Sequence, residues 1–437
     1  MFSPVTAYQR GAKAMLQNST MLDAPPLAAT GNVGHFVRFG LKQRRWVGKT
    51  GQVATEHMMQ ANARAYLKGG RTGTGLAALR TEVGRLMAGF AANGAVPVEP
   101  AALLSADILI DLYGEDLRAR AYTTHDPVLG EQMLRPDFTV PVAQMHLESG
   151  AALGRYAYAG SVWRRQEPGS ARPVEYLQCG FEAFGDSNTA QADAEVFAMI
   201  AEALRNAPVT PVTGDMGIIL AGISALETTP PRKAALMRHL WRPERFTRLL
   251  ERYAAPLSQS NTRAALLSAL RGGTLEGYLS TQGPAIGLRS LSEIKKRAEI
   301  LLEDAETPPI PLAQVALLER ALAVKAPMKE AIESLRNIAV EMPALAPAID
   351  LIEARAEAIS DFGIDGFQLP FEASYGRTSL EYYDGFVFGF TAEARADLPQ
   401  IAQGGRYGAL TRALGRETPA VGGIIRPEAL LALGGAQ

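Results

Sequence analysis

Residues 162–185, VWRRQEPGSARPVEYLQCGFEAFG, contain the pattern from which we predict the architecture of this chain. β-forming residues run over 156–163, and they resume over 176–184 after a segment interrupted by two prolines and a glycine. Proline and glycine break regular structure. The two β-forming runs therefore predict an antiparallel hairpin joined by a long loop over 166–175.

The second strand of this hairpin has two different faces, because side chains alternate across a β-strand. Gln178, Gly180 and Glu182 share one face, and the other is a predicted core face formed by Leu177, Cys179, Phe181 and Ala183. Gly160 and Arg164 repeat the polar arrangement on the opposing strand. A face that combines glycine with Arg, Gln and Glu predicts room for a small polar ligand and groups to bind it. A solvated sheet face with a surface Arg/Glu pair is the alternative.

The composition limits the classes of protein to consider. With 437 residues the chain exceeds a typical single domain, and 44 Lys/Arg against 45 Asp/Glu give a formal net charge of −1. Global charge therefore gives no argument for binding nucleic acid or a membrane surface. We find no apolar run long enough to span a membrane and no secretory signal with a cleavage site.

The cysteine and histidine content indicates a chain without a metal cluster. Cys179 is the single cysteine, which excludes an internal disulfide and a cysteine-based metal site, so we expect a cytoplasmic protein. Its position on the core face predicts a buried structural thiol and not a nucleophile. The five histidines are scattered without the spacing of metal ligands. We therefore expect neither a metal nor a cofactor.

The first 75 residues differ from the rest of the chain in charge. Residues 1–70 hold nine Lys/Arg and two Asp/Glu without a strong hydrophobic period. This basic stretch runs into GGRTGTG, 69–75, which we interpret as a flexible linker. We expect 1–75 to be a basic, disordered extension without a role in the fold. A targeting arm or an RNA-binding arm is the alternative.

The rest of the chain predicts an α+β fold in three parts. Residues 76–208 hold the first part of a core that contains the hairpin. Residues 209–360 are rich in Leu, Ala and Arg and predict a mostly helical insertion. β-character returns over 361–437, which we expect to complete the core.

Individual elements can be placed within these parts. Apolar residues at helical spacing predict a helix from Leu76 that ends at Asn93, and another over 190–204. The segment LRPDFTVPVAQMH, 134–146, predicts a strand end that runs into a helix. The dipeptide at 384–385, Asp-Gly, lies between aromatic and β-branched runs and predicts a further hairpin.

The order of these segments resembles the core of the class II aminoacyl-tRNA synthetases. A helix and a strand ending at Pro100, LRPDFT, the hairpin with Arg164, LEYYDG, GGRYGAL and a glycine strand before a final helix follow one another as in that family. More specifically, residues 76–437 are similar to histidyl-tRNA synthetase. The resemblance implies an antiparallel sheet core flanked by helices, and its first motif implies a homodimeric core.

The resemblance also implies a histidine pocket. Seven positions match it: Asp137, Thr139, Arg164, Gln178, Glu182, Tyr382 and Tyr383. The first two stand where the family has Glu and Thr, in position for the α-amino group, and the arginine belongs to its second motif. Gln178 and Glu182 match the pair that holds the amino group and the imidazole, and the tyrosines belong to the histidine-specific motif. An amine and an imidazole N–H both need acceptors, which one strand face would supply.

Departures from the family pattern point away from catalysis. Thr378 and Ser379 replace an arginine and a glycine of the histidine-specific motif, and Ala429 replaces the arginine that binds ATP in the third motif. Arg426 comes three residues earlier, and we expect it to point elsewhere on a helix. Each lost cation removes stabilisation of charge that develops as an adenylate forms, typically worth ~10²–10³ in rate. The chain ends at Gln437, so we expect no anticodon-binding domain and no bound tRNA.

A synthetase-like core with a histidine pocket but without the ATP arginines resembles the regulatory subunits of ATP phosphoribosyltransferase. That resemblance implies a non-catalytic subunit, which partners the short-form catalytic subunit in the first step of histidine biosynthesis and transmits feedback by histidine. It also implies a homodimeric core within a hetero-octamer. A truncated histidyl-tRNA synthetase or a related amino-acid ligase is the alternative. An RNA-binding module built on residues 1–70 is a third reading, which no aromatic-basic pattern supports.

Overall fold

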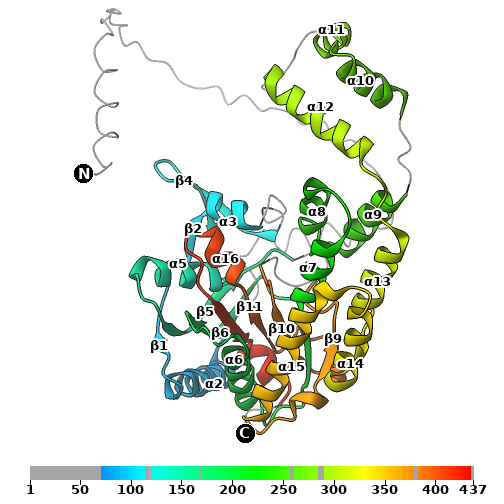
Figure 1. The fold of residues 1–437 in the computed structure, drawn as a ribbon. Coiled ribbons are helices and arrows are strands. Elements are labelled where there is room, and N and C mark those ends of the chain that lie inside the picture. The colour runs from blue at the N-terminus through cyan, green and yellow to red at the C-terminus, as the bar shows by residue number, and fades with distance from the viewer. Residues whose placement is uncertain are drawn as a thin grey trace, which may run out of the picture. The chain divides into compact units, whose positions relative to one another are not determined.

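The structure, a computed structural model, describes residues 70–113, 118, 120–166, 170, 172–255, 260–283, 290–377 and 382–434 (Figure 1). The basic extension up to residue 69, Thr378 and Ser379 lie outside the described residues. No helix in the described part of the chain is long and apolar enough to cross a membrane.

Helix α2 (Gly73–Ala92) is the first described element. It begins three residues before the predicted start at Leu76, so part of the segment that we interpreted as a linker is helical. It ends where the sequence predicts, because Asn93 is its C-cap and Gly94 follows with a φ of 79°. That left-handed conformation favours glycine.

A mixed sheet of nine strands forms the centre of the described residues. Most neighbours pair antiparallel, and the pairs β1–β5 and β7–β9 are parallel. The predicted antiparallel α+β core is thereby confirmed. The strands follow one another across the sheet as β1 (Val96–Pro97), β5 (Gly154–Trp163), β6 (Glu175–Phe184), β12 (Ala420–Ile425), β11 (Ala402–Arg406), β10 (Phe386–Thr391), β7 (Thr210–Asp215), β9 (Pro370–Glu372) and β8 (Lys325–Pro327).

The predicted hairpin is the β5–β6 pair. Its register places Tyr156 opposite Glu182 and Gly160 opposite Gln178. Cys179 lies on the core face as expected, fully buried, and burial raises the pKa of its thiol to about 12. A thiol with such a pKa stays protonated at neutral pH, so it is not a nucleophile.

Helices cover both faces of the sheet. One face packs against α2, α6 (Thr189–Ala203), α15 (Ala346–Ser360) and α17 (Pro427–Leu431), and α6 and α15 run side by side (Figure 1). The apolar layer there includes Phe197 with alternate residues of β10, Phe386, Phe388 and Phe390. The opposite face packs against α5 (Thr139–Ser149) and α16 (Gly408–Ala413). Strand alternation therefore separates an apolar face from the face that carries Gln178 and Glu182.

The segment 209–360 is mostly helical, but it opens with β7, which pairs with β10 inside the main sheet. The segment therefore contributes two strands to the sheet, β7 and the edge strand β8, and its separation as an insertion stays a prediction. Its helices are α7 (Met216–Ala225), α8 (Pro230–Met237), α9 (Pro243–Ala254), α10 (Asn261–Arg271), α11 (Leu275–Thr281), α12 (Leu291–Glu306), α13 (Leu312–Leu322), α14 (Met328–Ala339), the 3₁₀ turn η1 (Pro343–Leu345) and α15.

The hairpin predicted at Asp384-Gly385 is wrong. Described residues 382–385 form no strand, and β10 pairs with β7 and β11. The Asp384 carboxylate instead accepts the backbone N–H groups of Gly408 and Ala409, where α16 begins. The remaining elements are a small sheet of β2 (Leu103–Ser105), β4 (Gly130–Leu134) and β3 (Thr123–Asp126), helix α3 (Ala106–Tyr113), and the 3₁₀ turns η2 (Gly366–Gln368) and η3 (Glu393–Arg395).

Candidate functional site

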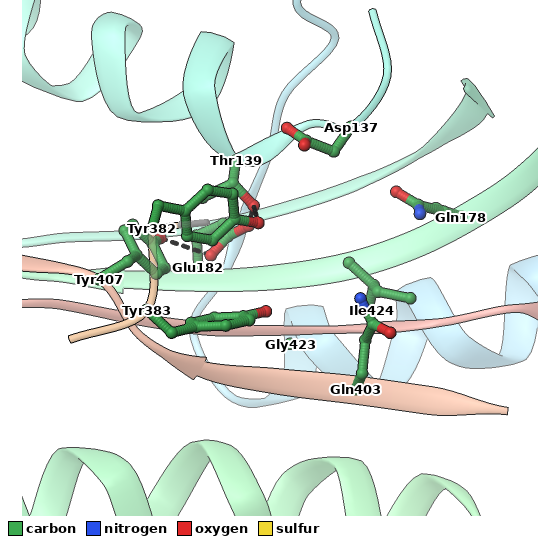
Figure 2. Close-up of a pocket in the computed structure, with 11 residues that line it drawn as sticks. Asp137, Thr139, Gln178, Glu182, Tyr382, Tyr383, Gln403, Tyr407, Gly423 and Ile424 are labelled. Carbon is green, nitrogen blue, oxygen red and sulfur yellow. Dashed lines mark hydrogen bonds between the residues drawn. The ribbon is translucent and has the colours of Figure 1, made fainter. Parts of the chain in front are cut away.

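A small cavity lies on the polar face of the sheet, between β6, β11, β12 and the start of α5 (Figure 2). Its volume is about 10 Å³, roughly the space that one water molecule needs. A bound amino acid would therefore require lining side chains to shift. The lining residues are Asp137, Thr139, Gln178, Glu182, Tyr382, Tyr383, Gln403, Tyr407, Gly422, Gly423 and Ile424.

Six of the seven predicted site residues line this cavity, although they come from segments as far apart as 137 and 383. Arg164 is the exception. Its Nε donates to the carbonyl oxygen of Pro136 at 2.8 Å, next to Asp137 in the chain. The arginine thus lies behind the segment that carries Asp137, outside the lining itself. Whether the seven residues bind histidine stays a prediction.

Glu182 accepts hydrogen bonds from three hydroxyl groups and is 1% exposed. Its Oε1 accepts from Thr139 at 3.1 Å and from Tyr158 at 2.9 Å, and its Oε2 accepts from Tyr407 at 2.5 Å. Burial raises the pKa of this carboxyl to about 7, although the three hydroxyls oppose the rise. A carboxylate offers about four acceptor positions. One position therefore stays available to a ligand.

The tyrosines form a wall beside this carboxylate. The Tyr382 hydroxyl donates to Oγ1 of Thr139 at 3.2 Å, which in turn donates to Glu182. The rings of Tyr382 and Tyr383 meet edge to face with centroids 4.9 Å apart, and the ring of Tyr407 lies 5.8 Å from that of Tyr382. Such a relay fixes the orientation of the carboxylate and surrounds it with aromatic surface.

Two acceptors lie at the other end of the cavity, where Figure 2 shows Asp137 and Gln178 on the same side of Glu182. Gln178 is 1% exposed, and its side-chain oxygen has no hydrogen-bond partner among the described residues. Asp137 is 4% exposed. Buried polar atoms are nearly always paired, so the Gln178 oxygen indicates a donor that a ligand would bring.

The sequence led us to expect that the two glycines of the hairpin make room for a ligand. In the structure they do not. A Cβ on Gly180 would lie 2.3 Å from the ring of Tyr158, and one on Gly160 would lie 2.9 Å from the side chains of Arg135 and Phe138. Both glycines are covered by the protein's own side chains. The cavity instead adjoins Gly422 of β12, where a Cβ would lie 1.6 Å from Oε2 of Glu182.

Three functional candidates were not selected from the sequence: Tyr407, Gln403 and Arg426. Tyr407 lies in GGRYGAL, a segment that we used only for the resemblance. Arg426 does not lie on a helix as we expected, because it precedes α17 as its N-cap, with φ −100° and ψ 96°. Its Nη2 donates to Oε1 of Gln403 at 3.2 Å, which brings it next to the cavity. Ala429 is buried in the apolar layer.

The described residues hold no group of three or more His, Cys, Asp or Glu side chains arranged for a metal ion. The cavity combines acceptors with phenol and amide donors. Such a set suits a small zwitterion that brings both donors and acceptors.

Comparison with known proteins finds relatives over most of the chain. The family model described as histidyl-tRNA synthetase matches residues 76–303 and 295–430. The ATP phosphoribosyltransferase regulatory subunit of Allorhizobium ampelinum is 31% identical over 355 residues, which cover 78% of this chain and 94% of the relative. The protein of that name from Brucella canis is 31% identical over 388 residues, covering 84% of this chain and 99% of the relative.

A solved structure supports the same relationship at the level of the fold. The crystal structure of an ATP phosphoribosyltransferase regulatory subunit/histidyl-tRNA synthetase from Bacillus halodurans matches with a TM-score of 0.59 at 18% identity. The match covers 86% of this chain and 83% of that chain. At this identity the likeness concerns the fold alone. The predicted class II synthetase-like fold is confirmed.

Proposed function

Because the chain belongs to the family of ATP phosphoribosyltransferase regulatory subunits, we propose that it binds histidine in the cavity around Glu182 and transmits feedback to a short-form catalytic subunit. The relatives that carry this name match over more than nine-tenths of their length. We include in the proposal a homodimeric core within a hetero-octamer, and no role for tRNA.

The observation that carries the proposal is the buried, unpartnered side-chain oxygen of Gln178. An unpaired buried acceptor costs about 1–3 kcal/mol, and an ammonium group would satisfy it. At the other end of the cavity Glu182 keeps one acceptor position, which suits an imidazole N–H. Two acceptors at opposite ends therefore match the two nitrogen-bearing ends of histidine.

Two features of the chain support a regulatory role without catalysis. Ala429 takes the place that an ATP-binding arginine has in the synthetases, and it is buried among apolar residues. Thr378, which lies outside the described residues, takes the place of the catalytic arginine. A chain without these two cations lacks stabilisation for the charge of an adenylate-forming transition state.

Histidine binding to the purified chain, measured by calorimetry, tests the proposal. Gln178→Leu removes the unpartnered acceptor, so we expect histidine affinity to fall roughly 5- to 150-fold. The matched control is Gln368→Leu, on an exposed residue of η2, which should bind histidine as the wild type does. Both variants should still co-purify with the catalytic subunit.

Two results would contradict the proposal. One is wild-type protein that binds no histidine, alone or in complex with the catalytic subunit. The other is histidine-dependent pyrophosphate exchange at the rate of an active synthetase, which would favour the ligase alternative.

A further inference from the structure

Arg426 is a buried guanidinium beside the cavity. It is 8% exposed, its Nη1 donates to the carbonyl oxygen of Gln400 at 2.5 Å, and its Nη2 donates to Gln403 at 3.2 Å. A further hydrogen bond joins it to Tyr176. None of these partners, all within the described part of the chain, is a carboxylate. Burying a cation without a counter-ion is costly, so such a group favours an anion nearby.

A second positive charge acts on the same place. Burial lowers the pKa of Arg426 to about 10, and the nearby charge of Arg164 acts in the same direction. Arg164 is held against the carbonyl of Pro136, at the Asp137 end of the cavity. Two like charges that repel each other in a partly desolvated place are both stabilised by one anion.

Gln403 connects Arg426 with the cavity. Because its Oε1 accepts from Arg426, its orientation is fixed by a donor, and its Nε2 is the end that remains for another acceptor. Figure 2 shows the Gln403 amide beside Ile424, which also lines the cavity. The pair thus presents an amide donor to the cavity with a guanidinium behind it.

We propose that Arg426 and Gln403 form a subsite for the α-carboxylate of the ligand and make a free carboxylate a requirement for binding. The inference rests on the proposed function and deepens it, because it names the ligand class as a free amino acid. The acceptors Asp137 and Gln178 take the ammonium group, and Gln403 takes the carboxylate with the charge of Arg426 behind it. Amines and esters of the same side chain lack the anion and bind more weakly.

The test compares histidine with histamine and histidine methyl ester, neither of which has a negative charge, by calorimetry on the full chain. We expect wild-type protein to bind histidine roughly 10- to 100-fold more tightly than either analogue, since hydrogen bonds to charged groups contribute that much. Arg426→Met should abolish most of the difference by weakening histidine binding and leaving histamine binding unchanged.

A second variant tests the subsite even if Arg426→Met does not fold. Gln403→Glu keeps a partner for Arg426 and places a negative charge where the carboxylate would lie. It should weaken histidine binding and strengthen histamine binding, so that the order of affinities reverses.

Three outcomes are informative. Loss or reversal of the preference in the two variants supports the subsite. An unchanged preference in both variants overturns it, while the proposed function stands because histidine still binds. Failure of all three ligands to bind wild-type protein, both alone and in complex with the catalytic subunit, refutes the proposed function itself, and the subsite with it.

Discussion

Glu182 holds its proton more tightly than an ordinary carboxyl, because burial raises its pKa to about 7. The folded chain therefore keeps a proton that the unfolded chain has already lost between about pH 4.5 and 7. The stability that this proton contributes is fully present at a pH below the pKa that Glu182 has in the unfolded chain. It is lost as the pH rises through the folded pKa near 7.

Glu182→Gln should remove this dependence on pH, because an amide does not ionise. Between pH 5 and pH 7.5, we expect the free energy of unfolding to fall further in the wild type than in the variant. The expected difference between the two is on the order of 2 kcal/mol. Urea denaturation at the two pH values measures it. The control is Glu276→Gln, an exposed carboxyl of α11, which should follow the wild type. Parallel curves for wild type and Glu182→Gln would show that this carboxyl ionises normally.

At the residue scale, the sequence was sufficient for side chains that share one strand. Alternation alone placed Gln178 and Glu182 on one face, and the structure has both in one cavity. It could not identify Tyr407, whose hydroxyl reaches Glu182 across 225 positions of the chain. It could not show either that Tyr158 covers Gly180. Both facts depend on contacts between elements that are separate in the sequence, which a local pattern does not contain.

At the scale of elements, β12 is the strand that shapes the cavity. It pairs with β6 so that Gly422 lies opposite Glu182, and a Cβ on this glycine would overlap the carboxylate. The sequence of β6 or β12 predicts which side chains share a face of that strand. It does not predict that the two strands pair, because they are far apart in sequence. The misplaced hairpin at Asp384 has the same cause, since the aspartate serves as acceptor for the start of α16.

Gly422→Ala tests the close approach of β12 to Glu182. Because the added Cβ would lie 1.6 Å from Oε2, the carboxylate or the strand must move, and we expect a lower thermal midpoint and at least tenfold weaker histidine binding. Gly84→Ala is the matched control in α2. It meets no atom within 4 Å, and alanine favours a helix over glycine. Its midpoint should equal or exceed that of the wild type. A tolerated Gly422→Ala would mean that the strands can separate easily.

At the scale of the whole described unit, one buried ion network joins the three parts of the chain that we distinguished from the sequence. Arg355 of α15 donates to Asp193 of α6 at 2.9 Å and to Asp215 at the end of β7 at 2.8 Å. Arg406 of β11 donates to Asp193 at 2.8 Å. Arg406 directly precedes Tyr407, whose hydroxyl contacts Glu182.

Arg355→Met should destabilise the protein by about 3–5 kcal/mol, because it leaves two carboxylates buried without their shared cation. Arg336 is a matched control, since it also contacts two carboxylates, those of Asp350 and Glu353, but at the surface. Water replaces such partners readily, so Arg336→Met should change the free energy of unfolding far less. Urea denaturation of both variants at one pH measures the difference. Equal losses would show that the buried network contributes no more than a surface pair, and the three parts would then be held together by apolar packing and by the strand pairs β7–β10 and β6–β12.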